Sequence, residues 1–437
     1  RWLSTLTLSA SSLCVTCTSS IYTMTYSQII PEFNTPRIIA VLGLTLFVLG
    51  LGVGVLFLAP LSEFFGRRPV YVGSFAVFTV CLVPCALAPN MGVMLAFRFL
   101  GGVAGSAFLS VAGAGVGDMF EGQELGAPMM VYSGSPFLGP EVGPLIGGFI
   151  NDHVSWRWTF WVMLIWSGFQ LLGLYFLVPE SYHPVLLRHH AHHLRKTVDP
   201  RYHAPIELST RSIPHTIATF CTRPFELLIM EPMLTFLCIF TAILLGVLYL
   251  FFQAFPRTFG TLHNMGLSEI GLTFLGLFVG MILAVFTDPI WRRIYIHLST
   301  QHGSPQPEFR LPSGVIGSLL VPIGIFWFAS TSSASIHPIV PIIGSGFFAF
   351  GTLLVFSSVF TYLVEAYPLY AASALASNSF VRSCFAGAFP LFEEQAYEKL
   401  GFRGAGCLVG GVTVVMAPGM WIFFKYGQRI RRRSRYA

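Results

Sequence analysis

The chain is unusually poor in charged residues. Only 10% of its 437 residues are Asp, Glu, Lys or Arg, whereas 54% are hydrophobic. Soluble domains carry about a quarter charged residues, which they need to cover their surface. Together with the mean hydropathy of +0.70, this shortage excludes a soluble protein, so we expect the chain to lie in a lipid bilayer.

Lysine is the scarcest charged residue, with Lys196, Lys399 and Lys425 as its three occurrences, and none of them follows a glycine. A phosphate-binding P-loop needs Gly-Lys-Ser/Thr, so an ATP-driven pump on this chain is excluded. No catalytic constellation and no polar stretch long enough for a separate enzyme domain is visible. We therefore predict neither an enzyme nor a cofactor.

No metal site is predicted either. The run His189–His193 has no carboxylate or cysteine partners, so it is interpreted as part of a solvated basic loop. The eight cysteines fall mostly inside apolar runs and are interpreted as packing residues. The chain starts at Arg1 without a methionine or a recognisable signal peptide, and we expect a native N-terminal tail to precede it.

Apolar segments of membrane-spanning length, about 20 residues each, predict an all-α membrane protein with twelve transmembrane helices in two six-helix bundles related by a pseudo-twofold axis. The expected organisation is an N-terminal bundle at 1–178, a linker at 179–228, a C-terminal bundle at 229–426 and a basic tail at 427–437. The predicted spans are 3–26, 38–60, 69–88, 91–117, 126–150, 156–178, 229–255, 266–288, 312–331, 336–364, 369–395 and 401–426.

The distribution of Lys and Arg predicts the orientation, because cytoplasmic loops are enriched in both. With the N-terminus inside, 18 of the 25 basic residues fall on the cytoplasmic side, five on the opposite side and two within spans. Both termini are therefore expected in the cytoplasm. The basic tail directly follows a span, which favours an anchor to anionic lipid over an arm that binds nucleic acid.

A charged turn is predicted between the second and third spans, at Glu63, Gly66, Arg67 and Arg68. Gly66 permits a tight turn, and an acid beside two arginines can latch two helices and release them when the bundle moves. An ordinary positive-inside loop is the simpler alternative. The spacing recurs after the eighth span at Asp288, Arg292 and Arg293, as an internal duplication would produce.

Arg98 lies within the apolar fourth span, where a charge is costly and marks a functional site by default. Glu141, in the middle of the fifth span, is its expected partner, because the two come out at similar depth on antiparallel helices. We predict that Glu141 exchanges protons and that Arg98 biases the exchange. A purely structural ion pair is the alternative.

The fifth span carries glycine and proline at intervals of four residues. Gly139, Gly143 and Gly147 form a stripe for close helix approach, while Pro136, Pro140 and Pro144 loosen the backbone hydrogen bonds. The pattern indicates a hinge between the two half-bundles. Dimerisation through the stripe is the alternative.

Taken together, these segments resemble the major facilitator superfamily, and more narrowly its fungal twelve-span drug:proton antiporters. Segment 59–68 is similar to the family's motif between spans two and three, 98–106 to its span-four motif, and 134–148 to its span-five antiporter motif. Ala59, Glu63 and Phe64 depart from the first motif, but the acid and the paired arginines remain.

The resemblance implies proton-coupled export of small hydrophobic molecules by alternating access, in a monomer of the plasma membrane. It also implies a central substrate cavity, which would receive the polar side chains of the spans; for each of them, hydrogen bonding between helices is the alternative. The predicted cavity residues are Ser19, Tyr22, Tyr26, Tyr132, Tyr249, Gln253, Asn378 and Arg382. An uptake carrier for a nutrient or a polyamine, or a non-transporting sensor, remains open, although Gln253 stands where a carrier of cations would be expected to have an acid.

Overall fold

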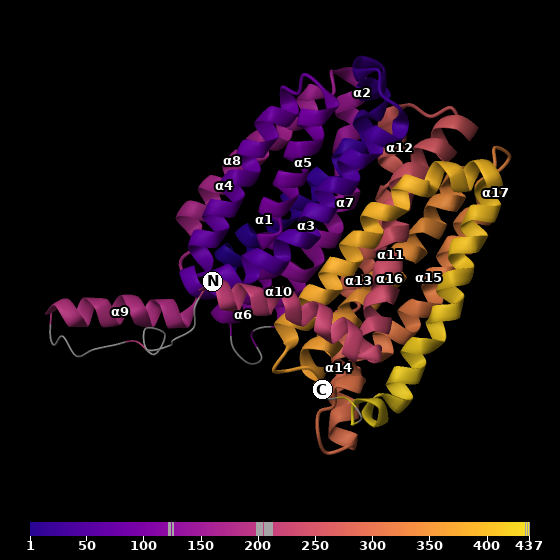
Figure 1. Ribbon diagram of the computed structural model, residues 1–437. Helices are drawn as coiled ribbons and strands as arrows, with labels where there is room; N and C mark the ends of the chain where they lie inside the picture. The colour runs from indigo at the N-terminus through magenta and orange to yellow at the C-terminus, as the bar shows by residue number, and fades with distance from the viewer. Residues whose placement is uncertain are drawn as a thin grey trace.

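The computed structural model describes residues 1–120, 124, 126–197, 204, 213–432, 434 and 436, and these residues form helices and connections without a strand. The helices form two groups that stand side by side, one from each half of the chain (Figure 1). Both chain termini lie at the same end, called the lower end here because it is at the bottom of Figure 1. The predicted basic residues Arg201, Arg211, Arg433 and Arg435 fall outside the described residues.

The N-terminal bundle has six spans, two of which are interrupted helices. The first span joins α1 (Trp2–Ile21), the 3-10 turn η1 (Tyr22–Thr25) and α2 (Tyr26–Phe33), and the fourth joins α5 (Met91–Gly105) and α6 (Ala107–Met119). The other four are α3 (Arg37–Phe65), α4 (Arg67–Ala86), α7 (Gly126–His153) and α8 (Arg157–Leu177).

The C-terminal bundle also has six spans. Its last helix, α17 (Ala371–Arg431), contains two of them, because Gly401 has the positive φ of 69° and a ψ of 173°, which break the helix there. The others are α11 (Pro232–Phe255) with the π-helical turn η3 (Pro256–Leu262), α12 (Leu267–Thr273) with α13 (Leu275–Phe286), α15 (Pro312–Thr331) and α16 (Ile339–Ala366). α14 (Asp288–Gln301) and the 3-10 turn η4 (Pro307–Arg310) connect α13 to α15.

Within the described ranges, nine helices are long and apolar enough to cross a membrane. The twelve predicted spans differ from this number because α17 is counted once and because α1 and α7 are less hydrophobic. α1 remains compatible with a bilayer because its hydroxyls bond within the helix: Thr7 donates to Leu3 O, Ser11 to Thr7 O and Thr18 to Cys14 O.

The predicted linker is largely helical where the structure describes it, apart from residues 179–182 and 204. α9 (His183–Thr197) projects sideways from the lower end, and α10 (Ile213–Met230) runs across it (Figure 1). α10 contacts both bundles: Cys221 Sγ lies 3.8 Å from Leu56 O, and Ser377 Oγ donates to Pro224 O at 2.9 Å. The connection is thus held against the bundles at α10. The predicted tail likewise begins within a helix, since α17 continues to Arg431.

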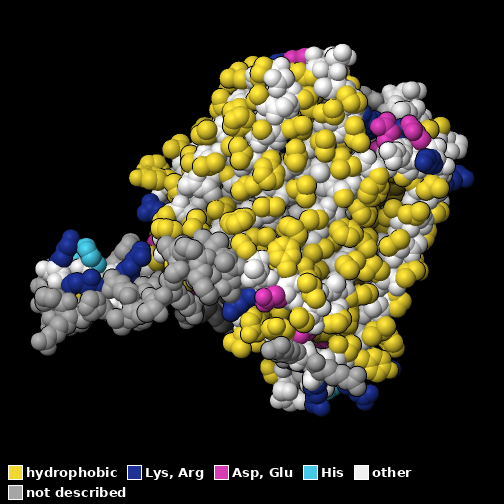
Figure 2. All heavy atoms as spheres, in the orientation of Figure 1, with side chains coloured by type: hydrophobic (Ala, Val, Ile, Leu, Met, Phe, Trp, Pro, Cys, Tyr) yellow, Lys and Arg dark blue, Asp and Glu magenta, His cyan; other side chains and the backbone are white. Residues whose placement is uncertain are grey.

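The surface agrees with a protein that spans a membrane. Hydrophobic side chains cover the middle of both bundles on the face shown in Figure 2, whereas charged side chains gather near the two ends and on α9. Large apolar side chains such as Phe169, Phe176 and Phe286 are at least 70% exposed, as side chains that face lipid would be.

Candidate functional site

The glycine stripe of α7 packs against α1, within its own bundle. A Cβ atom at Gly143 would lie 2.7 Å from Ile21 N and 2.8 Å from Cys17 O, and Gly139 and Gly147 are equally close to α1. The stripe thus allows close approach of two helices of the same bundle, and the hinge predicted for α7 stays a prediction. Because α1 covers it, the stripe is also not free to form a dimer.

A different face of α7 meets the C-terminal bundle. A Cβ atom at Gly148 would lie 2.5 Å from Leu267 O, and one at Gly271 would lie 2.8 Å from Pro144 O. α7 remains helical along its whole length although it contains Pro136, Pro140 and Pro144. The contact between bundles at this end therefore involves the proline-containing helix, with the backbones of α7 and α12 in direct contact.

Arg98 of α5 is 2% exposed and hydrogen-bonded on all sides. Its guanidinium donates to Gly43 O at 3.0 Å, to Thr18 O at 2.8 Å and to Ser19 O at 3.0 Å. It also lies 4.3 Å from the ring centre of Tyr22 and 4.6 Å from that of Phe47. These contacts hold α1 and α3 together at the point where α1 changes to a 3-10 turn.

Glu141 of α7 does not pair with Arg98. The carboxyl group is 1% exposed, and neither of its oxygens has a hydrogen-bond partner. The predicted pair is not formed because the interrupted first span offers Arg98 its carbonyl oxygens instead. A buried carboxylate without a donor is costly, and among the acids within the predicted spans of the N-terminal bundle Glu141 is the one in this position.

Two polar contacts join the bundles near the centre. Ser19 Oγ lies 3.0 Å from Tyr249 Oη, and Gln253 Nε2 donates to Tyr26 Oη at 3.4 Å. Gln253 Oε1 in turn accepts from Arg37 Nη2 at 3.1 Å. The structure thus brings four of the predicted cavity residues together across the interface.

Arg382 of α17 is the other arginine within a predicted span, and it is 9% exposed. Its Nε and Nη1 atoms have no hydrogen-bond partner. The guanidinium instead lies 5.0 to 5.5 Å from the ring centres of Phe137, Phe356 and Phe360, the first of which belongs to the other bundle. Glu141 and Arg382 both lie within electrostatic range of Tyr249.

The three remaining predicted cavity residues are held within their own bundles. Tyr132 Oη donates to Phe108 O at 2.9 Å, and the ring of Tyr22 packs on Arg98. Asn378 Nδ2 donates to Thr241 Oγ1 at 2.7 Å. These contacts favour the alternative of hydrogen bonding between helices for Tyr132 and Asn378.

The predicted turn at the lower end is stabilised by residues that the motif did not include. Gly66 has a φ of 98°, which favours glycine. The Arg67 guanidinium pairs with Asp118 Oδ2 at 3.1 Å and donates to Ser62 Oγ at 2.6 Å. The turn thus connects the start of the third span to the end of the fourth.

A carboxylate caps the helix that begins at this turn. Glu180 Oε1 accepts from Arg67 N at 2.9 Å, and Glu180 Oε2 accepts from Arg68 N at 3.1 Å. Free amides and the positive end of the dipole at a helix N-terminus favour such an anion. Glu180 lies directly after the sixth span, at the start of the linker, so its two hydrogen bonds connect the linker to the charged turn.

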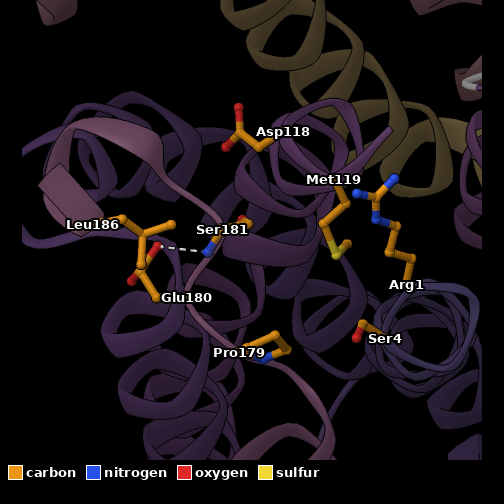
Figure 3. Close-up of a pocket in the computed structure, with 8 residues that line it drawn as sticks. All are labelled: Arg1, Ser4, Asp118, Met119, Pro179, Glu180, Ser181 and Leu186. Atoms are coloured by element: carbon orange, nitrogen blue, oxygen red, sulfur yellow. Dashed lines mark hydrogen bonds between the residues drawn. The ribbon is translucent and has the colours of Figure 1, made fainter. Parts of the chain in front are cut away.

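Figure 3 shows a cavity of about 220 Å³ beside this cap. Asp118, Glu180 and Ser181 approach it from one side and Arg1 and Ser4 from the other (Figure 3). The cavity lies at the lower end, away from Glu141 and Arg382. It belongs to the charged turn rather than to the central polar residues.

The C-terminal bundle has the equivalent contact, but at other residues than predicted. Arg310, directly before the third span of this bundle, pairs with Glu365 at the end of the fourth, with Nη2 2.7 Å from Oε1. Asp288 lies within electrostatic range of both Arg292 and Arg310, and Arg292 and Arg293 are exposed on α14. Because α14 continues directly after α13, the sequence from Asp288 to Arg293 forms a helix and not a turn.

Charged contacts also close the upper end. Arg257 Nη1 lies 3.7 Å from Glu393 Oε1, and Glu393 is only 2% exposed. Arg37 of the other bundle lies within electrostatic range of the same carboxylate. Ser268 of α12 donates to Asp152 of α7, which adds a second contact between the bundles. The central polar residues are thus buried beneath contacts at both ends.

Comparison with known proteins identifies the family. The family model described as Major Facilitator Superfamily matches residues 8–390. The chain belongs to the major facilitator superfamily. Among solved members, the xylose transporter XylE of E. coli superposes with a TM-score of 0.69 at 17% identity, over 97% of this chain and 95% of the other, and so supports the twelve-helix, two-bundle fold.

Fungal members of the superfamily are similar over nearly the whole chain. The efflux pump atB of Aspergillus terreus is 53% identical over 89% of this chain and 83% of its own length. The probable drug/proton antiporter YHK8 of Saccharomyces cerevisiae is 42% identical over 98% of this chain and 84% of its own length.

Sequence reasoning missed several charged residues of this superfamily member. Asp118, Glu180, Glu365 and Glu393 form the contacts at the two ends. Each is an acid near the end of an apolar segment. Because the chain has so few acids, that position could have indicated a charged contact. The positive-inside count considered only Lys and Arg and therefore could not use it.

Proposed function

We propose that this chain exports hydrophobic small molecules, such as drugs, toxins or secondary metabolites, in exchange for protons that move inward. Relatives with the printed names efflux pump and drug/proton antiporter support this proposal. An uptake carrier would move its substrate in the opposite direction, and a sensor would not transport a substrate at all.

Glu141 is the observation that carries the proposal. Its carboxyl group is buried in the bundle interior and has no hydrogen-bond partner. An ionisable group in the middle of a span is costly, and in transporters it marks a proton relay. We assign the proton to Glu141, whereas the three carbonyl bonds of Arg98 favour a structural part in holding α1.

Alternating access would use the contacts at the two ends in turn. The bundles at 1–178 and 229–426 would move against each other, while the linker at 179–228 connects them on the cytoplasmic side. The Arg67–Asp118 and Arg310–Glu365 pairs would brace the cytoplasmic end, and the Arg37–Gln253 contact would open when the outer end opens. We place the transporter in the plasma membrane as a monomer with both termini in the cytoplasm.

The test is transport of an uncharged hydrophobic dye, Nile red, into inside-out membrane vesicles. An acidic lumen should accelerate dye loading severalfold, and a protonophore should abolish the acceleration. Glu141→Gln should remove the dependence on the gradient. Glu269→Gln is the matched control and should keep the dependence on the gradient, because Glu269 caps α12 at the exposed outer end, accepting from Gly266 N at 3.0 Å.

Acceleration that persists in Glu141→Gln would overturn the assignment of the proton site. Loading that occurs only in right-side-out vesicles would indicate an uptake carrier. Absence of loading in both orientations, with correctly inserted protein, would indicate a sensor.

A further inference from the structure

Two buried ionisable groups, an acid and an arginine, face the interior from opposite bundles, and both have polar atoms without a hydrogen-bond partner. Glu141 offers two acceptor oxygens without a donor, and Arg382 offers Nε and Nη1 without an acceptor. Buried polar groups in native proteins are nearly always hydrogen-bonded. These four atoms are therefore the strongest indication in the described residues of a molecule that binds there.

The two groups are linked through shared neighbours, Phe137 and Tyr249. Phe137 and Glu141 are four residues apart on α7 and so lie on the same face of the helix. The ring of Phe137 packs against the Arg382 guanidinium at 5.5 Å. Tyr249 lies within electrostatic range of both charges, while its hydroxyl is bonded to Ser19.

An aromatic platform lies beside Arg382. The ring of Phe137 stacks on that of Phe356, with centres 4.7 Å apart, and on that of Phe360 at 6.1 Å. Phe356 and Phe360 are themselves nearly parallel, with 6° between their planes. Flat aromatic molecules pack well against such faces.

We propose that Glu141 and Arg382 together form the substrate site, and that this site takes a flat, uncharged molecule that carries a hydroxyl donor and a carbonyl acceptor. The hydroxyl donates to the Glu141 carboxylate, and the carbonyl accepts from one of the two unpartnered nitrogens of Arg382, Nε or Nη1. The rings of Phe137, Phe356 and Phe360 pack against the molecule's face. This inference rests on the proposed function and names the substrate class for it.

The site would couple substrate to proton by competition. An ionised carboxylate only accepts hydrogen bonds, and a bond to a charged acceptor is about twice as strong as one to a neutral group. Protonation of Glu141 removes the charged acceptor and so weakens binding of the hydroxyl. Proton and substrate thus exclude each other, which an exchange of one for the other requires.

Few other ionisable groups could compete for this role. Tyr249 is the titratable neighbour of Glu141 from the C-terminal bundle, with Arg382 and Arg98 in range of the same hydroxyl. The elements packed on α7 contribute Cys14 and Cys17 of α1, Tyr22 of η1, Asp118 of α6, Arg157 and Tyr175 of α8, and Glu269 of α12, while α13 has no titratable residue.

The test compares two fluorescent probes of nearly the same size, 7-hydroxycoumarin and 7-methoxycoumarin, which share the carbonyl and differ in the hydroxyl donor. Binding is measured on the purified full chain in lipid nanodiscs. Wild type should bind the hydroxyl compound about tenfold more tightly, the amount expected for one hydrogen bond to a charged group. Lowering the pH should reduce this preference without changing the affinity for the methoxy compound.

The variants separate the two groups. Glu141→Gln should bring the affinities for the two probes within about twofold of each other and remove the pH dependence. Arg382→Gln should weaken both probes by about tenfold and keep the preference for the hydroxyl. Glu269→Gln should bind as wild type does, and the pH series on wild type decides the matter even if a variant misfolds.

A hydroxyl preference that survives Glu141→Gln would overturn the inference, as would unchanged affinities in Arg382→Gln or a wild type that binds neither probe. In each of these cases, proton-driven loading of Nile red would leave the proposed export function standing. Loss of that loading in wild type would instead refute the proposed function itself.

Discussion

The two arginines buried in the bundles have opposite surroundings. Arg98, in the N-terminal bundle, donates to three backbone carbonyls and packs between two aromatic rings. Arg382, in the C-terminal bundle, packs on three aromatic rings and has two nitrogens without a partner. The two arginines are similarly buried, yet Arg98 stabilises the packing of its helices, whereas Arg382 has nitrogens that remain without a hydrogen-bond partner.

A charged residue in a membrane span is therefore not necessarily a residue that takes part in transport. Arg98 is bound by carbonyls that α1 exposes where it becomes a 3-10 turn, so its cost of burial is offset inside the fold. Arg382 has cation–π contacts but no such acceptors. Hydrogen-bond satisfaction therefore separates the two arginines better than burial or hydropathy does.

The largest expected effect comes from removing Arg98. Arg98→Gln should lower the stability of the protein by about 3 kcal/mol, because three hydrogen bonds at about 1 kcal/mol each are lost. Thermal unfolding in detergent, followed by size-exclusion chromatography, measures this loss. Arg382→Gln is the matched variant, and we expect its stability to equal that of wild type within about 1 kcal/mol, because no hydrogen bond of the Nε or Nη1 atoms is lost.

Equal destabilisation by the two substitutions would contradict the comparison. So would an Arg98→Gln protein of normal stability whose transport no longer responds to the proton gradient. That second outcome would instead support the role predicted from the sequence, in which Arg98 takes part in proton coupling.

A smaller effect is expected from the glycine stripe, which holds α7 on the same helix that Arg98 holds. Gly143→Ala should cost about 1–3 kcal/mol, since a Cβ atom there meets the backbone of α1 and overpacking of this kind is destabilising. Gly168→Ala in α8 is the control, because a Cβ atom at that position meets nothing within 4 Å.

The control should be neutral or gain about 0.5–1 kcal/mol, as alanine is the better helix former. Thermal unfolding measures both variants under the same conditions. If Gly143→Ala were as stable as Gly168→Ala, the stripe would not be a tight contact, and α1 would be free to move against α7.

The sequence was sufficient for the architecture because hydropathy and charge directly report the lipid environment. The predicted span at 126–150 agrees closely with α7, and the break between the fifth and sixth spans of the second half coincides with Gly401. Helix α1 was also predicted, although its many hydroxyls lower its hydropathy, because the residues between them are apolar.

The pairing of side chains could not be predicted, because it depends on backbone features that hydropathy does not record. Arg98 was assigned to Glu141 from depth alone, but the interrupted first span supplies closer acceptors. The second charged contact was assigned to Asp288 and its following arginines from spacing. There α14 stays helical, Asp288 lies within electrostatic range of Arg292 and Arg310, and Arg310 itself pairs with Glu365. Such contacts lie between segments far apart in the sequence, so a motif within one segment cannot show them.

The smallest expected effects concern the two charged contacts at the lower end, Arg67–Asp118 in the N-terminal bundle and Arg310–Glu365 in the C-terminal bundle. Asp118→Asn and Glu365→Gln should each cost at most about 1 kcal/mol of stability, since ion pairs near solvent contribute little. The Arg67 side chain is 10% exposed and that of Arg310 is 31% exposed. Because salt screens exposed pairs more strongly than buried ones, the effect of Glu365→Gln should vanish at high ionic strength, whereas that of Asp118→Asn should persist. Thermal unfolding at low and high salt measures both, and equal salt sensitivity would show that the two bundles carry equivalent contacts despite their different burial.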